Sequence, residues 1–130
     1  MNTFYHLLGI GFAGAIGTLA RYGVTLGTAF IFGTSYPWGT YLVNLFGCFL
    51  FGIVLGLISC GSLSTEWRAI LLTGLLGGFT TFSAFAYENQ QFLSERRWSA
   101  FIFHLVGQNF LGIAAVFGGL LLVNLFFVRK

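Results

Sequence analysis

The chain has 130 residues, of which 57% are hydrophobic and only 7% are charged, and its formal net charge is +3. Soluble domains carry roughly 25% charged residues, so these charges are too few to cover a water-facing surface. The composition therefore excludes an ordinary soluble enzyme or nucleic-acid-binding domain and predicts a membrane protein.

Four long apolar stretches follow one another along the chain, separated by short polar segments. A bilayer core of ~30 Å takes about 20 helical residues. We expect spans at about residues 4–32, 38–60, 67–92 and 98–128. A cleaved signal peptide would account for only one such stretch. The pattern predicts an all-α membrane protein with a single four-helix transmembrane domain covering residues 1–130.

The basic residues are divided almost evenly between the two sides of this layout. On or near the side of the termini lie Arg68, Arg129 and Lys130, and on or nearer the other side lie Arg21, Arg96 and Arg97. The positive-inside rule normally produces a clear imbalance. The balance favours insertion in both orientations and an antiparallel homodimer. The alternative is a single orientation fixed by a feature other than these charges.

The chain contains 19 glycines, and two pairs have the small-xxx-small spacing that lets membrane helices approach closely. These pairs are Gly23 with Gly27 and Gly52 with Gly56. They indicate tight packing either within one bundle or between subunits. The two cysteines, Cys48 and Cys60, have no CxxC spacing and are interpreted as small apolar residues rather than metal or redox groups.

The middle of the third span holds the segment GGFTTFSAF, residues 77–85. Two glycines followed by β-branched and hydroxyl residues are poor helix formers. Unwound backbone at membrane depth is tolerated where it is buried in protein or lines a cavity, and broken helices of this kind form ion sites. We predict that the third helix breaks here. The alternative is a continuous helix with glycine at a packing face.

Several side chains are candidates for an ion path. Phe82 and Phe85 share a helix face, and their positive ring edges could line a path for an anion, although ordinary core or lipid contact is the alternative. Asn44 lies within an apolar run, where its amide either bridges helices or lines a pore. His104 and Gln108 are four residues apart and form either a polar track or an internally satisfied pair.

Arg21 interrupts the first apolar stretch. An arginine at a helix centre costs roughly 2.5–3.5 kcal/mol on insertion scales, so this side chain should snorkel, pair or face water. The functional interpretation is a vestibule cation that concentrates anions. The alternative is an end residue whose charge reaches the interface. Glu88, about one turn beyond Phe85, is expected near an interface.

Three motifs in this order and spacing carry a family resemblance. The first joins residues 14–17 (GAIG) to Arg21 and Tyr22, the second joins residues 37–40 (PWGT) to Val43, Asn44 and Gly47, and the third is residues 77–85 with Glu88. On these motifs the chain resembles the Fluc (CrcB) family of fluoride channels over essentially its whole length. It departs from the family pattern at Ala84, where threonine is common, and at Gly112, where serine is frequent.

The resemblance implies a fluoride-selective channel in the bacterial plasma (inner) membrane that lets cytoplasmic fluoride leave passively and so confers fluoride resistance. It implies an antiparallel, dual-topology homodimer with two pores along the subunit interface. A structural Na⁺ that is not transported would be held by the backbone carbonyls of Gly77 and Thr80. Arg21 would lie at the vestibule. The expected pore lining, with the fourth-span candidates included, is Phe82, Phe85, Asn44, Ser83, Thr40, Thr81, His104 and Gln108.

The main alternative is a small dual-topology multidrug exporter. That class requires a membrane-buried carboxylate for proton coupling, whereas Glu66, Glu88 and Glu95 all lie near the ends of the expected spans. A structural or regulatory membrane subunit is a second alternative. An enzyme is not expected, because no catalytic constellation or phosphate-binding loop is present in the sequence.

Overall fold

The computed structural model describes residues 3–64 and 66–127, so the expected last residue of the fourth span, Val128, lies outside the described part. Its helical elements are α1 (Thr3–Phe32), α2 (Trp38–Ser59), α3 (Glu66–Arg68), the π-helix η1 (Ala69–Leu76), α4 (Gly77–Phe79), α5 (Phe82–Ser94) and α6 (Trp98–Phe127). Because α3 to α5 form one bent segment, the described chain has four helical segments long and apolar enough to cross a membrane. The all-α prediction with four candidate spans is therefore confirmed.

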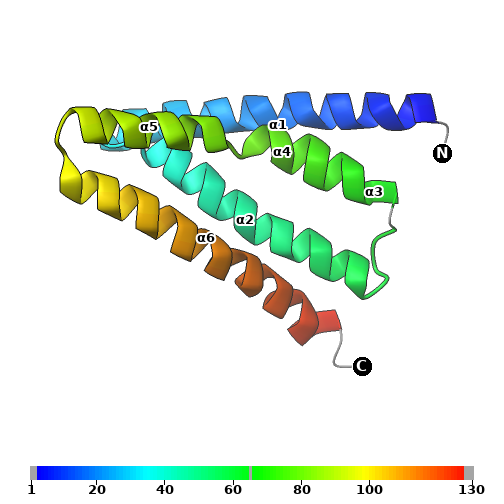
Figure 1. Ribbon diagram of the computed structural model, residues 1–130. Helices are drawn as coiled ribbons and strands as arrows, with labels where there is room; N and C mark the ends of the chain where they lie inside the picture. Colours follow the sequence, from blue (N-terminus) through cyan, green and yellow to red (C-terminus); the bar gives the residue numbers. More distant parts are fainter. Residues whose placement is uncertain (1–2, 65, 128–130) are drawn as a thin grey trace.

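The four segments run back and forth as a layered bundle. Figure 1 shows both chain ends and the loop between α2 and α3 at one end of the molecule, with the α1–α2 and α5–α6 turns at the other. At that second end, Arg97 Nη2 donates a 2.8 Å hydrogen bond to Ser35 O, and its guanidinium lies 5.0 Å from the centre of the Phe92 ring. This contact ties the two turns together.

Glycines bring α1 into backbone contact with the third segment. A Cβ added at Gly17 would lie 2.0 Å from Leu75 O, and one added at Gly78 would lie 2.4 Å from Gly14 O. Both distances are far below van der Waals contact, so no larger residue fits without moving a helix. The glycine motif near the start of the chain is thus a close-packing surface.

A second glycine contact joins α2 to α6. A Cβ at Gly52 would lie 2.1 Å from Val116 O, and one at Gly119 would lie 2.2 Å from Phe49 O. Gly23 and Gly27 behave differently, because nothing in the described chain lies within 4 Å of a Cβ at either position. One predicted glycine pair therefore packs within the chain, and the other lies on its open surface.

The third segment is interrupted at Thr80 and Thr81, whose backbones are extended (ψ 161° at Thr80 and φ −150° at Thr81). Thr81 then caps α5, because its hydroxyl accepts a 3.2 Å hydrogen bond from the Ala84 amide. The alternative of a continuous helix is wrong. The β-branched, hydroxyl-bearing pair ends one helix and starts the next at the predicted position.

The chain leaves large apolar side chains uncovered on its outer faces. Phe12, Phe30 and Phe126 are 72%, 92% and 73% exposed. Contiguous exposed apolar surface of this kind is the signature of a chain that faces lipid or further protein. Together with the four apolar helices, it defines a multi-pass membrane protein.

Candidate functional site

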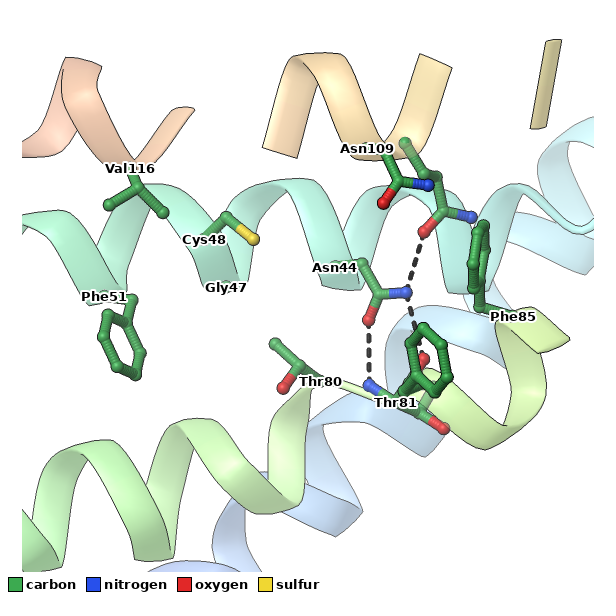
Figure 2. Close-up of a pocket in the computed structure, with 11 residues that line it drawn as sticks. Asn44, Gly47, Cys48, Phe51, Thr80, Thr81, Phe85, Asn109 and Val116 are labelled. Carbon is green, nitrogen blue, oxygen red and sulfur yellow. Dashed lines mark hydrogen bonds between the residues drawn. The ribbon is translucent and has the colours of Figure 1, made fainter. Parts of the chain in front are cut away.

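An open groove of about 390 Å³ runs beside the break in the third segment, between α2 and α6. Its lining consists of Asn44, Gly47, Cys48, Phe51, Thr80, Thr81, Phe82, Phe85, Gln108, Asn109 and Val116. Figure 2 shows Asn44 on α2 turned toward the extended Thr80–Thr81 backbone, with Phe85 beside it. The groove therefore gathers amides, threonines and aromatic rings from three different spans.

Asn44 bridges α2 to the helix break. Its Oδ1 accepts a 2.8 Å hydrogen bond from the Thr81 amide, and its Nδ2 donates at 3.1 Å to the Thr81 carbonyl. The same Nδ2 donates at 2.8 Å to Gln108 Oε1 on α6. One side chain thus satisfies the backbone of the break, as a buried polar backbone requires, and reaches a third span.

The backbone carbonyls of residues 77–80 lose their usual helical donors at the break, and those of Gly77 and Thr80 are two of them. In a continuous helix, Gly77 O would accept from the Thr81 amide and Thr80 O from the Ala84 amide. The Thr81 amide donates instead to Asn44, and the Ala84 amide donates to the Thr81 hydroxyl. Gly77 is exposed and Thr80 is partly exposed. Among the carbonyls that the break frees, those of Gly77 and Thr80 therefore belong to an exposed and a partly exposed residue.

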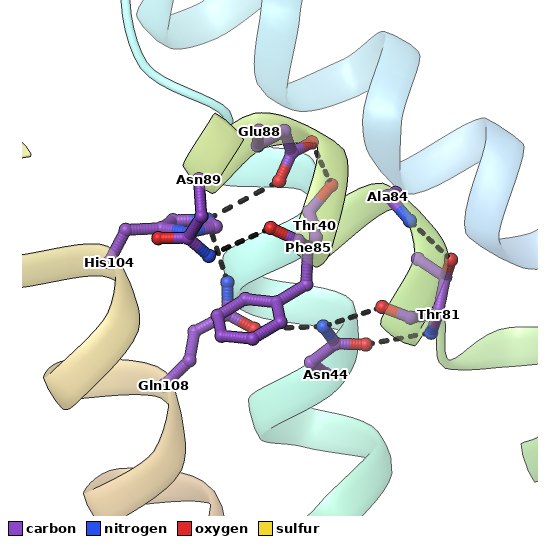
Figure 3. Close-up of polar contacts among 9 residues, drawn as sticks. All are labelled: Thr40, Asn44, Thr81, Ala84, Phe85, Glu88, Asn89, His104 and Gln108. Carbon is purple, nitrogen blue, oxygen red and sulfur yellow. Dashed lines mark hydrogen bonds and ion pairs between the residues drawn. The ribbon is translucent and has the colours of Figure 1, made fainter. Parts of the chain in front are cut away.

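A chain of polar contacts continues inward from Gln108, as Figure 3 shows. Gln108 Nε2 lies 2.8 Å from His104 Nε2, and that ring nitrogen lies 3.3 Å from Glu88 Oε2. The other carboxyl oxygen, Glu88 Oε1, accepts a 2.5 Å hydrogen bond from the Thr40 hydroxyl. Three helical segments, namely α2, the bent third segment and α6, therefore share one connected polar network.

The two predicted phenylalanines occupy different environments. Their ring centroids are 5.6 Å apart, yet Phe82 is 77% exposed and Phe85 only 7%. Phe85 stacks on the His104 ring at 5.2 Å. Phe82 is therefore largely exposed beside the groove, while Phe85 also belongs to the core of the chain.

The structure brings six of the predicted residues to the groove: Asn44, Thr80, Thr81, Phe82, Phe85 and Gln108. Thr40 and His104 are buried behind it in the polar network. The Ser83 hydroxyl lies 3.3 Å from that of Thr81. Arg21 is partly buried on α1 and is outside the groove lining.

Sequence reasoning missed three contributors to this region. Asn109 lines the groove and donates to Leu105 O at 2.6 Å, and Cys48 lines it from α2. Glu88 turns inward rather than toward an interface, since its side chain is only 16% exposed. Cys48 lies one turn from Asn44, which was an available signal, whereas the inward turn of Glu88 depends on His104 of another helix and leaves no signal in the sequence.

The lining contains no charged side chain, and its polar atoms are amides, hydroxyls, backbone groups and one thiol. No group of three or more His, Cys, Asp or Glu side chains suited to a metal exists among the described residues. These features define the class: a small multi-pass helical membrane protein with a neutral, donor-rich groove at a broken helix.

Comparison with known proteins identifies the family. A family model described as "CrcB-like protein, Camphor Resistance (CrcB)" matches residues 8–120. A "Fluoride-specific ion channel FluC" of Nitrosococcus oceani is 50% identical over 111 residues, covering 85% of this chain and 89% of the relative. Proteins of that name from Solidesulfovibrio magneticus (47% identity; 89% and 94% covered) and Chloroflexus aurantiacus (46%; 88% and 91%) are also similar. The chain belongs to the CrcB/FluC family, which confirms the resemblance.

Proposed function

We propose that this chain is a fluoride-specific ion channel that lets cytoplasmic fluoride leave the cell passively. The observation that carries the proposal is the groove at the broken helix, where neutral donors and aromatic rings lie together without a charged side chain. The names of the relatives agree with this function. Membership in this family also argues against an enzyme.

The chemistry of the lining suits a small, strongly hydrated anion. A pore must replace the hydration shell with its own groups. Gln108 keeps one N–H beyond the one that faces His104, and Asn44 would exchange its contact with Thr81 O or Gln108 Oε1 for one with the anion. The positive edges of the Phe82 and Phe85 rings attract an anion weakly. Conduction requires binding weak enough for release, so the absence of a fixed cation from the lining favours passage over trapping.

A second, antiparallel copy of the chain supplies the other wall of each pore in this proposal. The groove is open in the single subunit, and Phe82 is 77% exposed beside it. Gly23 and Gly27 leave open space on α1 for close approach of another helix. The even division of basic residues between the two ends supports opposite orientations of the two subunits.

A structural Na⁺ fits the carbonyl oxygens of Gly77 and Thr80. The amides that would donate to these two carbonyls in a continuous helix donate to other acceptors. Because hard cations prefer oxygen ligands, the two carbonyl oxygens suit such an ion. Two oxygens from one subunit form half a site, so a symmetric partner would contribute the other two. When bound, the ion would hold the two broken helices together at the centre of the dimer. Unwound carbonyls at a helix break coordinate Na⁺ in other membrane proteins.

Proton-coupled export is the second candidate, and one observation favours it. Glu88 is a largely buried carboxylate beside a fully buried histidine, which is the kind of pair that proton-driven transporters use. In that case, a pH gradient across the membrane would drive transport without any other ion gradient.

Fluoride and chloride efflux from liposomes tests the proposal. Purified protein is reconstituted into vesicles loaded with KF or KCl, and valinomycin is added so that K⁺ can balance the charge. A fluoride-specific channel releases fluoride promptly and chloride at the rate of protein-free vesicles. Equal release of the two anions would contradict the proposal, and efflux that requires a pH gradient would favour the exporter.

A further inference from the structure

The His104 ring is fully buried, at 0% exposure, among polar atoms that lack partners. Phe85 stacks on it at 5.2 Å, and the rings of Tyr36 and Tyr41 lie 5.7 Å and 6.1 Å away. The described residues contain six buried side-chain atoms without a hydrogen-bond partner, and five belong to this neighbourhood: Tyr36 Oη, Tyr41 Oη, Glu88 Oε2, Asn89 Oδ1 and His104 Nδ1. The neighbours therefore dictate which ring nitrogen carries a proton.

The first constraint begins at the backbone of the helix break. A backbone amide can only donate and a backbone carbonyl can only accept. The Thr81 backbone therefore fixes the Asn44 carboxamide, with Oδ1 facing the Thr81 amide and Nδ2 facing the Thr81 carbonyl. Asn44 Nδ2 then requires an acceptor from Gln108, which presents Oε1 at 2.8 Å. The Gln108 NH₂ group is consequently turned to His104 Nε2 at 2.8 Å. Since an NH₂ group can only donate, Nε2 has to be unprotonated.

A second constraint acts on the other ring nitrogen. Asn89 Nδ2 donates at 2.8 Å to Phe85 O, which fixes that carboxamide and leaves Oδ1 as an acceptor. Asn89 shares a helix face with Phe85 and Phe92, and both of these rings pack on the imidazole, at 5.2 Å and 5.5 Å. Asn89 Oδ1 and His104 Nδ1 are both buried and unpaired. With Nε2 unprotonated, the proton of the neutral ring lies on Nδ1.

Glu88 also approaches this ring nitrogen. Its Oε2 lies 3.3 Å from His104 Nε2, while Oε1 already accepts from Thr40. An unprotonated Nε2 has one lone pair, and the closer contact at 2.8 Å is with the Gln108 NH₂ group. The Tyr36 and Tyr41 hydroxyls can each donate or accept and impose no further restriction.

We propose that His104 is a positioning residue, held as the Nδ1–H tautomer with Nε2 accepting from Gln108. In this role it fixes the Gln108 amide, whose Oε1 accepts from the Asn44 NH₂ group beside the groove. The consequence for fluoride rests on the proposed function, whereas the tautomer does not. His104 thus acts from behind the groove and does not line it.

Nitrogen NMR of protein labelled at its histidine ring nitrogens tests the tautomer directly. The chain has two histidines, so the signals lost in His104→Gln identify those of His104. The expected spectrum shows a protonated Nδ1 and an unprotonated Nε2 at neutral pH. A protonated Nε2, in either the other neutral tautomer or the imidazolium, would overturn the proposal whether or not the protein conducts fluoride.

Fluoride efflux from liposomes tests the positioning role. His104→Gln keeps a side-chain oxygen that can accept from Gln108, and its flux should stay within about twofold of the parent chain. His104→Leu removes the acceptor and should lower flux by on the order of tenfold, the effect of one lost buried hydrogen bond. Equal flux in both variants and the parent would overturn the role. If the parent shows the expected tautomer but passes no fluoride, the proposed function fails and the assigned tautomer stands.

Discussion

Asn44 on α2 holds both backbone polar groups of Thr81, accepting from the amide at 2.8 Å and donating to the carbonyl at 3.1 Å. This contact replaces the helical hydrogen bonds that the third segment gives up at its break. It also points an amide at the groove. The stability of the break and the chemistry of the groove therefore depend on the same side chain.

Substitutions of Asn44 should separate these two roles. Asn44→Leu leaves the Thr81 amide and carbonyl unpaired and should lower stability by about 1–2 kcal/mol, the scale of polar contacts between membrane helices. Asn44→Asp keeps the acceptor for the Thr81 amide but loses the donor to Thr81 O and Gln108. Both variants should lose most fluoride flux, and Asn44→Asp should retain more thermal stability in detergent. Parental flux in Asn44→Asp would contradict the role of the NH₂ group.

The two phenylalanines should respond differently to the same substitution. Phe82→Ile changes an exposed ring, so it should lower fluoride efflux by about tenfold, equivalent to ~1.4 kcal/mol of ring interaction, with little change in the stability of the fold. Phe85→Ile removes a ring packed on His104 and should lower both efflux and melting temperature. Unchanged efflux in Phe82→Ile would remove that ring from the permeation path.

Adjacent glycines on α6 provide a matched test of helix packing. A Cβ at Gly119 would lie 2.2 Å from Phe49 O, so Gly119→Ala should force α2 and α6 apart and cost about 2 kcal/mol. At Gly118 the nearest atom lies 3.9 Å away, and Gly118→Ala should be nearly neutral. Thermal unfolding in detergent, followed by size-exclusion chromatography, measures both. Equal melting temperatures for the two variants would contradict the packing described for α2 and α6.

The four-helix fold could be predicted because charges are confined to a few positions between long apolar runs. The helix break was predictable for a local reason, since glycine and β-branched residues disfavour a helix regardless of tertiary contacts. The inward turn of Glu88 was not predictable, because it depends on His104 from another helix. Spacing placed His104 and Gln108 on one helix face, but only packing decides that Gln108 reaches the groove while His104 is buried behind it.

Dual orientation in the membrane can be measured at Cys60, which lies in the turn after α2. In a Cys48→Ser background, a membrane-impermeant maleimide should label about half of the chains in intact spheroplasts if insertion occurs both ways. The variant Glu95→Cys, in a background without other cysteines, places a cysteine at the opposite end. About half of these chains should also be labelled. Complete labelling at one end with none at the other would establish a single orientation.

The chemistry of Cys60 supplies an internal control for that labelling. A hydrogen bond with Ser62 lowers the pKa of the Cys60 thiol, so more reactive thiolate is present at neutral pH than for an ordinary cysteine. Ser62→Ala should raise this pKa and slow alkylation near neutral pH, and the difference should vanish at pH values above both pKa values. Identical rates at neutral pH would exclude the hydrogen bond as the cause.

The reversal potential of reconstituted protein in a planar bilayer, with unequal KF concentrations on the two sides and KCl making up the difference, tests passive fluoride selectivity most directly. It does not depend on the rate of conduction or on the amount of protein inserted. For a fluoride-specific channel, the reversal potential should equal the equilibrium potential of fluoride, and a pH gradient should not change it. A reversal potential near zero, or one that follows the pH gradient, would contradict the account.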